Sequence, residues 1–356
     1  MGRVQRLSLG ILGMDARAHS AGGALRGWLA LAPWLALVLL VAPPTWAGTL
    51  LVDVLDVGQG DAIFIQSPEG KTVLIDAGPR KANVVAELRA RGVTGLDLVV
   101  ATHPHSDHIG GMEQIVNEFP IGTYMDSGQS HTTATYRDVM EAVEEQGVPY
   151  VRAEKGQRIQ LGSEAVLWVL WPGKLYLSGT RSDHNSNSVV LRLEHQGHCV
   201  LLIGDAEAET EQRLLAQRPA PCEVLKVAHH GGAHSTTGRF LGAFQPRIAL
   251  ISVGNNGWGH PTEETLGRLA RRSIEVHRTD QAGTIRVLSS EAGLQVQEGI
   301  VAIPPVLSEV LPAPDVRQDS PTITAAREPD PPRASWREVR KARGAARRLR
   351  REERRE

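Results

Sequence analysis

The sequence is poor in cysteine, nearly balanced in charge and short of long apolar runs. Only two of its 356 residues are cysteines, so a metal site would rely on imidazole and carboxylate ligands rather than on thiolates. The formal net charge of −1 argues against a molecule that binds polyanions through its overall charge. The one long apolar run, residues 28–42, is shorter than the roughly 20 residues that a membrane-spanning helix needs.

The two ends of the chain differ from its middle. Residues 1–47 combine arginines, the apolar run and small residues near Ala47, which predicts a signal peptide, with an uncleaved N-terminal anchor as the alternative. We therefore expect export to the periplasm or the outside of the cell. Residues 303–356 are rich in proline and then in arginine, which predicts an extended linker and a disordered tail. The tail either contacts nucleic acid or anionic lipid headgroups, or is solvated without a partner.

The two cysteines each begin an apolar run. Cys199 precedes residues 200–203, and Cys222 precedes residues 224–227. If these runs form neighbouring parallel strands, the two sulfurs start at similar heights and could form a disulfide, which export would permit. A pair of buried thiols is the interpretation we favour, with the disulfide as the alternative.

Residues 48–302 alternate between strand-like and helical patterns and are predicted to form one domain. The predicted strands cover residues 50–57, 61–66, 72–75, 98–101, 161–170, 188–193, 200–203, 224–227 and 248–253. The predicted helices cover residues 82–91, 136–146, 207–217 and 263–271. This mixture indicates an α/β fold with sheets covered by helices.

The densest group of potential metal ligands follows the predicted strand at residues 98–101. It consists of His103, His105, Asp107 and His108. Because a strand end delivers alternate side chains to one side, His103 and His105 can reach one metal ion while Asp107 and His108 turn toward a second. Imidazole and carboxylate ligands suit zinc, manganese or iron. A cluster of solvated loop histidines is the less economical alternative.

Other polar groups also follow predicted strands. Asp76 comes after residues 72–75, Asp205 after residues 200–203, and the pair His229-His230 after residues 224–227. Such repetition predicts one ligand set at one edge of a sheet.

The spacing of the first cluster matches the HxHxDH signature of the metallo-β-lactamase superfamily. Over most of residues 50–290 the chain most resembles the hydrolase domain of ComEC/Rec2-type competence proteins. The segments that carry this resemblance are residues 56–61, 76–78, 202–205, 225–231, 252–254, 259–261 and 278–280. The resemblance implies a four-layer αββα sandwich with a dinuclear metal site at the edge between two sheets.

The resemblance also assigns ligands to two divalent ions, with zinc expected and manganese as the alternative. The expected ligands of the first ion are His103, His105 and His184, and those of the second are Asp107, His108 and His230. Asp205 aligns with the bridging carboxylate, and His229 is the alternative to His230. Asp107 and Asp205 are the expected catalytic carboxylates.

Further residues are expected around this site. Asp76 is expected to orient a ligand histidine from behind, unless it is a turn aspartate that bonds its own backbone. Asp61 is either a substrate or supporting group or part of an ordinary turn. His260 belongs to a segment that we expect to close the site and contact substrate. Three other histidines are expected to be solvated: His131, His195 and His198.

The function implied by the resemblance is metal-dependent hydrolysis through a hydroxide that bridges the two ions. A phosphodiester is the favoured substrate, with nucleic acid as the candidate. The alternatives are a hydrolase of a lactone, thioester or β-lactam, and an envelope nucleic-acid-binding protein with a vestigial site. A competence protein of this type has many membrane-spanning helices and this sequence has one apolar segment, so a role in DNA import does not carry over.

Overall fold

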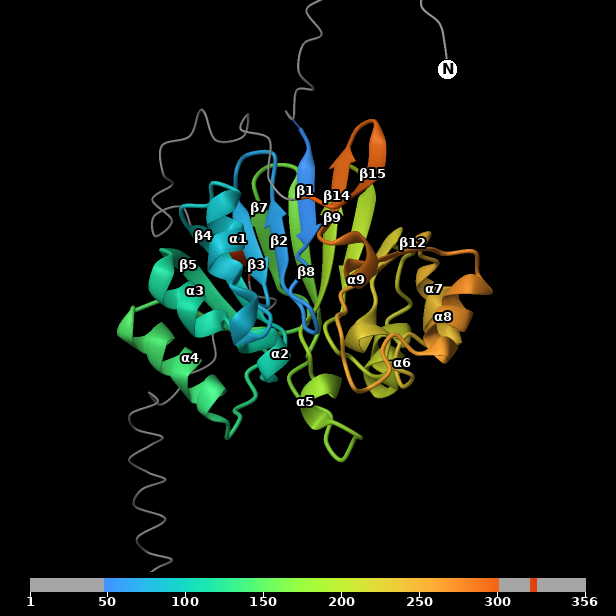
Figure 1. Cartoon of the computed structure of the whole chain (residues 1–356), viewed down its shortest axis with the longest axis horizontal. Helices are drawn as coiled ribbons and strands as arrows, with labels where there is room; N and C mark the ends of the chain where they lie inside the picture. Colours follow the sequence, from blue (N-terminus) through green and yellow to red (C-terminus); the bar gives the residue numbers. More distant parts are fainter. Residues whose placement is uncertain (1–47, 301–320, 325–356) are drawn as a thin grey trace, which may run out of the picture. The chain divides into compact units, whose positions relative to one another are not determined.

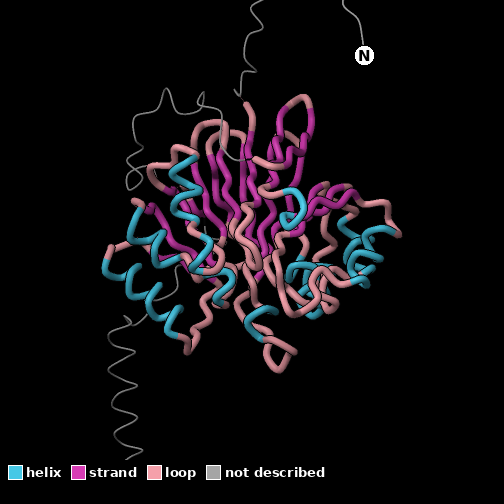
Figure 2. Tube along the Cα trace, in the orientation of Figure 1, coloured by secondary structure: helices cyan, strands magenta, loops and turns pink. Residues whose placement is uncertain are grey.

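The computed structural model describes residues 48–300 and 321–324. It contains two eight-stranded sheets packed face to face, with helices on both outer faces (Figure 1; Figure 2). The predicted leader at residues 1–47 and nearly all of the predicted linker and tail lie outside the described residues. Within the described part, no helix is both long enough and apolar enough to cross a membrane.

The first sheet collects the N-terminal strands and the last hairpin of the domain. Its order is β15 (Gly293–Glu298), β14 (Ile285–Ser290), β1 (Leu50–Val54), β2 (Ile63–Gln66), β3 (Thr72–Ile75), β4 (Leu96–Ala101), β5 (Ile121–Asp126) and β6 (Tyr150–Arg152). Its outer face is covered by α1 (Val84–Ala90), α3 (Met112–Glu118) and α4 (Ala134–Glu145).

The second sheet collects the strands from the middle of the chain. Its order is β13 (Glu275–Arg278), β12 (Ile248–Ile251), β11 (Val224–Lys226), β10 (His198–Leu202), β9 (Val190–His195), β8 (Ala165–Trp171), β7 (Arg158–Leu161) and β16 (Ile323–Thr324). Its outer face is covered by α6 (Ala208–Leu215), α7 (Gly238–Phe244) and α8 (Glu263–Ala270). Short helices connect the strands: η1 (Arg80–Ala82), α2 (Ser106–Ile109), α5 (Asp183–Ser186), η2 (Ala228–Gly231) and α9 (Thr279–Ala282).

Alternation along the strands builds three apolar layers. In β1, Val52 and Val54 face the second sheet and join the central core, whereas Leu51 joins the core under the helices. A strand places successive side chains on opposite faces, so one apolar strand can serve two cores at once. The structure therefore confirms the predicted four-layer αββα sandwich.

Some details differ from the sequence-based expectation. Residues 161–170, predicted as one strand, belong to the hairpin β7–β8, which turns at Gly162 with a φ of +87°. Within the predicted linker, Ile323 and Thr324 pair with β7 and extend the second sheet. His195 is buried between the two sheets rather than solvated. Its Nδ1 lies 3.0 Å from Ser289 Oγ on the opposite sheet.

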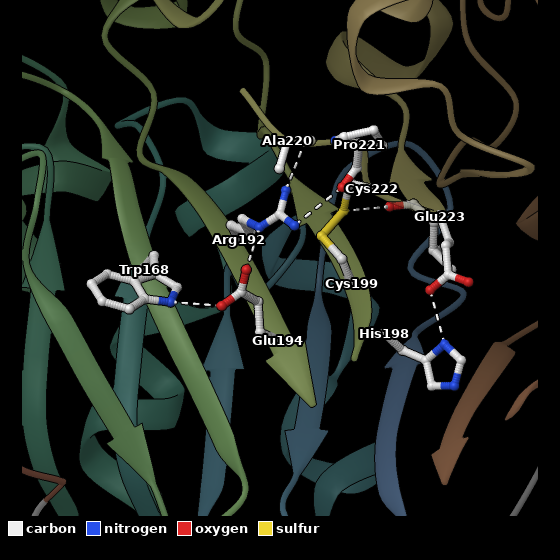
Figure 3. Close-up of a disulfide and its surroundings, with 10 residues drawn as sticks. Trp168, Arg192, Glu194, His198, Cys199, Ala220, Pro221, Cys222 and Glu223 are labelled. Carbon is white, nitrogen blue, oxygen red and sulfur yellow. Dashed lines mark hydrogen bonds and ion pairs between the residues drawn. A yellow bond between two sulfur atoms is a disulfide. The ribbon is translucent and has the colours of Figure 1, made fainter. Parts of the chain in front are cut away.

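The two cysteines form a disulfide, so the preference for free thiols was wrong (Figure 3). Strands β10 and β11 are parallel neighbours with Val200 opposite Val224. This register brings the Cα atoms of Cys199 and Cys222 to 5.0 Å, which lies within the range that a disulfide requires. Nearby on the same face, Arg192 bonds Glu194 and the carbonyl groups of residues 220 and 221.

Candidate metal centre

The ends of β4, β10, β11 and β12 meet at one edge of the sandwich, where α2 and α5 also lie (Figure 1). Backbone hydrogen bonds join the segments that follow these strands. Val189 N donates to Thr102 O at 2.9 Å, which links the two sheets, and His229 N donates to Gly204 O at 3.2 Å. Side chains from four separate segments therefore converge on one place.

The histidine cluster changes from strand to helix at His105, which is the N-cap of α2. His103 lies in the bend between β4 and α2, whereas Asp107 and His108 occupy the first turn of the helix. This change of direction turns the later pair toward a different part of the site. The close approach of Ala77 requires a glycine at position 111, because a Cβ on Gly111 would lie 2.5 Å from the carbonyl oxygen of Ala77.

Asp205 occupies the middle of the cluster and is almost fully buried. Its Oδ1 lies 3.3 Å from His108 Nε2 and 3.8 Å from His230 Nε2, while Asp107 Oδ2 lies 3.4 Å from the same His230 nitrogen. The Oδ2 atom of Asp205 lies 3.7 Å from Nε2 of both His103 and His229. The two oxygens of one carboxylate thus face two different sets of potential ligands.

Hydrogen bonds from behind orient the buried imidazoles. His108 Nδ1 lies 2.8 Å from Asp76 Oδ2, and His230 Nδ1 donates to the carbonyl oxygen of Ser252 at 2.9 Å. Asp76 also accepts from the backbone N–H and the hydroxyl of Thr102. With Nδ1 engaged, Nε2 of each ring is directed into the cluster, as in histidines that bind metals.

The arrangement fits divalent cations. Within the described residues, three buried atoms that face one another have no hydrogen-bond partner: His108 Nε2, His230 Nε2 and Asp205 Oδ1. Buried polar atoms are rarely left unsatisfied, so such a group needs an explanation. The structure offers four compact groups of possible ligands, drawn from Asp61, Asp76, His103, Asp107, His108, Asp205 and His230. Imidazole nitrogens and carboxylate oxygens suit zinc or manganese.

His105 and His184 lie at the side of this cluster. His105 Nδ1 is 3.0 Å from His103 Nε2, so His105 can share a cation with His103. The ring of His184 is centred 6.1 Å from that of His105 and 4.7 Å from that of His131. The structure thus groups His184 with His131, which we expected to be solvated, and places His229 beside the Oδ2 atom of Asp205.

Comparison with known proteins agrees with this geometry. Residues 55–254 match the family model described as the metallo-beta-lactamase superfamily. The chain belongs to the metallo-β-lactamase superfamily. It is 33% identical over 256 residues to ComE operon protein 3 of Bacillus subtilis, covering 66% of this chain and 32% of that protein. It is 29% identical over 282 residues to Recombination protein 2 of Haemophilus influenzae, covering 76% of this chain and 32% of that protein.

The chain therefore spans about a third of the length of these curated relatives. Among solved structures, the metallo-beta-lactamase fold protein YhfI from Bacillus subtilis aligns with a TM-score of 0.45 at 14% identity, covering 71% of this chain and all of that one. Proteins of the metallo-β-lactamase superfamily are generally metal-dependent hydrolases, and their fold implies divalent metal binding.

The candidate metal centre lies against a buried ion pair that the sequence pattern did not predict. Lys226 Nζ donates to Asp61 Oδ2 at 2.7 Å, and Asp61 Oδ1 lies 3.4 Å from His230 Nδ1. Asp61 is thus a supporting group behind a candidate ligand rather than an ordinary turn residue. The available signal was a lone lysine within the otherwise apolar run Val224-Leu225-Lys226-Val227.

Charges within the cluster shift several pKa values. Burial would raise the pKa of Asp61, but Lys226 and His230 outweigh it and hold that pKa below its usual range. Burial would lower the pKa of His230, but Asp205 and Asp61 raise it to about 9. Burial followed by the charges on His229 and His230 lowers the pKa of His260 to about 4. The buried carboxylates therefore attract positive charge into the site, and His260 at its margin stays neutral.

Proposed function

We propose that the chain is a dinuclear-metal-dependent hydrolase of phosphodiesters, with nucleic acid as the substrate class. The observation that supports two ions rather than one is the position of Asp205, whose oxygens face two ligand sets. Two divalent cations held by these residues would lower the pKa of a water toward about 7 and so make hydroxide available as the nucleophile at neutral pH.

The protein's own groups divide the remaining tasks. Asp107 and Asp205 provide negative charge at the cations, and Asp76 and the Ser252 carbonyl hold His108 and His230 in place. On one side of the cluster, Arg181 is 54% exposed and its Nε lies 3.4 Å from Glu207. This guanidinium can bind a phosphate oxygen of an anionic substrate. The name of one matching relative, Recombination protein 2, refers to recombination, which is a process of DNA, and this supports the same substrate class.

The test is a substrate panel with the full chain, stripped with EDTA and reloaded with zinc or manganese. We expect metal-dependent cleavage of single-stranded DNA, RNA or bis-p-nitrophenyl phosphate, abolished by EDTA and restored by the metal. Nitrocefin and a set of lactones serve as the comparison. Turnover of these compounds alone would favour the lactone, thioester or β-lactam alternative. A protein that binds nucleic acid but hydrolyses nothing would favour the vestigial site.

We also propose that the arginine-rich tail raises the local concentration of nucleic acid at the enzyme. The support is its composition, because clustered arginines bind phosphates by releasing counterions. A chain that ends at Thr324 removes the arginines yet retains β16. We expect its affinity for single-stranded DNA to fall less steeply with salt, by about 0.7 in the logarithmic slope for each phosphate that the tail neutralises in the full chain. An unchanged slope would assign the tail no role in binding.

A further inference from the structure

The loop between β12 and α8 presents a large aromatic side chain to solvent. Trp258 is 69% exposed, and with Leu175 it is one of two large hydrophobic side chains that are mostly exposed in the described part of the chain. Keeping an indole in water is unfavourable relative to burying it, because apolar area contributes roughly 25 cal/mol per Å² when it is removed from water. The exposed indole offers a flat aromatic face on which the ring of a ligand can stack.

The loop around Trp258 is held in one conformation by Asn256. The side-chain amide of Asn256 donates to the carbonyl oxygens of Gly254 and His260 at 2.8 and 2.9 Å. Its Oδ1 accepts from the backbone N–H groups of Trp258 and His260 at 3.1 and 3.0 Å. Four hydrogen bonds from one side chain thus hold the backbone that carries the indole in place before any ligand arrives, which lowers the entropic cost of binding.

The same loop packs directly on the segment that carries the candidate ligands His229 and His230. Thr262 donates from both its backbone N–H and its hydroxyl to Gly231 O, at 3.0 and 3.1 Å. Gly232 leaves room for the ring of His260, because a Cβ on Gly232 would lie 3.2 Å from His260 Nε2. The aromatic platform and the metal centre therefore belong to one packed unit.

A short series of contacts leads from Trp258 to the metal centre. The indole stacks on the His260 ring with centroids 6.4 Å apart and planes at 30°. The His260 ring is centred 5.3 Å from that of His229, whose Nε2 lies 3.7 Å from Asp205 Oδ2. His229 Nδ1 lies 3.5 Å from Glu207, the partner of Arg181. Three groups therefore adjoin one side of the cluster: the aromatic face of Trp258, the exposed guanidinium of Arg181, and the His260 imidazole. The buried Nδ1 of His260 has no hydrogen-bond partner among the described residues.

We propose that Trp258, with His260 and Arg181, forms a subsite for a nucleobase and its phosphate beside the metal centre. The base stacks on Trp258, and Arg181 holds a phosphate oxygen close to the site of cleavage. Because a base must be unstacked from its neighbours to reach an indole, the subsite selects single-stranded nucleic acid, and every base can bind it. This inference rests on the proposed phosphodiesterase function and specifies its substrate.

The test compares a decamer of thymidylate with a decamer of abasic sites that has the same phosphates. With the metal-loaded full chain, we expect kcat/KM to favour the thymidylate decamer by about tenfold. Trp258→Ala should remove most of this preference, mainly through KM, and Trp258→Phe should keep most of it because a phenyl ring still stacks. The matched control is Trp168→Ala, because the Trp168 indole bonds Glu194 on the outer face of the second sheet (Figure 3). The control should keep the full preference.

A second measurement does not depend on catalysis. In EDTA, the anisotropy of a labelled decamer should show tighter binding of thymidylate than of abasic sites, with the same order among the variants. If the wild type cleaves both decamers equally and Trp258→Ala changes neither assay, the subsite is wrong while the phosphodiesterase function stands. If the wild type cleaves neither decamer but binds thymidylate through Trp258, the proposed function is wrong and the base-binding surface stands. If the Trp168→Ala control also loses the preference for the thymidylate decamer, the preference does not depend on Trp258 and the subsite is wrong.

Discussion

Replacing Asp205 with asparagine is expected to lower metal-dependent hydrolysis by a factor of at least about 1,000 and to remove at least one bound metal ion. Asparagine has nearly the shape of aspartate but no charge. The two Asp205 oxygens lie 3.3–3.8 Å from nitrogens of His103, His108, His229 and His230. No other carboxylate in the described residues approaches that many of the candidate histidine ligands. The neutral amide would therefore weaken both ligand sets at once.

The measurement pairs metal analysis by plasma mass spectrometry with the initial rate on bis-p-nitrophenyl phosphate. The matched control is Asp138→Asn, which neutralises an exposed aspartate on α4. The control should keep the wild-type metal content and rate. An Asp205→Asn protein with two equivalents of metal and the wild-type rate would show that the centre of the proposed site has been misidentified.

The first group of candidate ligands was predictable because its residues lie close together in the sequence. His103, His105, Asp107 and His108 follow one buried strand, and their spacing alone indicates a cluster. The positions of His184 and His229 were harder to predict from the sequence. Both lie on segments whose paths depend on contacts far along the chain, such as the hydrogen bond from Val189 to Thr102. The resemblance to the superfamily nominated His184 for the first ion, and in the structure its ring is centred 6.1 Å from that of His105 and 4.7 Å from that of His131.

A fold of sheets covered by helices was predictable because apolar runs alternate with amphipathic helices, and the resemblance to the superfamily implied its four layers. The hairpin β7–β8 was missed because the turn residues 162–164, Gly-Ser-Glu, were read as part of the apolar run that follows them. Five further strands, β5, β6, β13, β14 and β15, and the helices α3 and α7 were missed as well. The disulfide and the burial of His195 depend on strand register and sheet packing, and neither is encoded in local pattern.

Replacing Lys226 with methionine is expected to destabilise the metal-free protein by about 3–5 kcal/mol, which lowers Tm by roughly 10 °C. Both side chains of the Lys226–Asp61 pair are at most 1% exposed. The variant would leave Asp61 buried, charged and without its cation, and removal of one partner of a buried pair is far more costly than removal of the whole pair. Urea denaturation in EDTA measures the effect without a contribution from bound metal.

Two further variants separate the ion pair from a simple packing defect. Lys226→Met combined with Asp61→Asn should recover a large part of the missing stability, because no unpaired charge then remains buried. Arg247→Met breaks a pair with Glu223 whose arginine is 66% exposed, and should cost no more than about 1 kcal/mol. If the double variant is as unstable as Lys226→Met alone, the lysine acts through its volume, and charge balance beneath the metal centre is not its role. If Lys226→Met is no less stable than Arg247→Met, the buried pair contributes nothing that the surface pair does not.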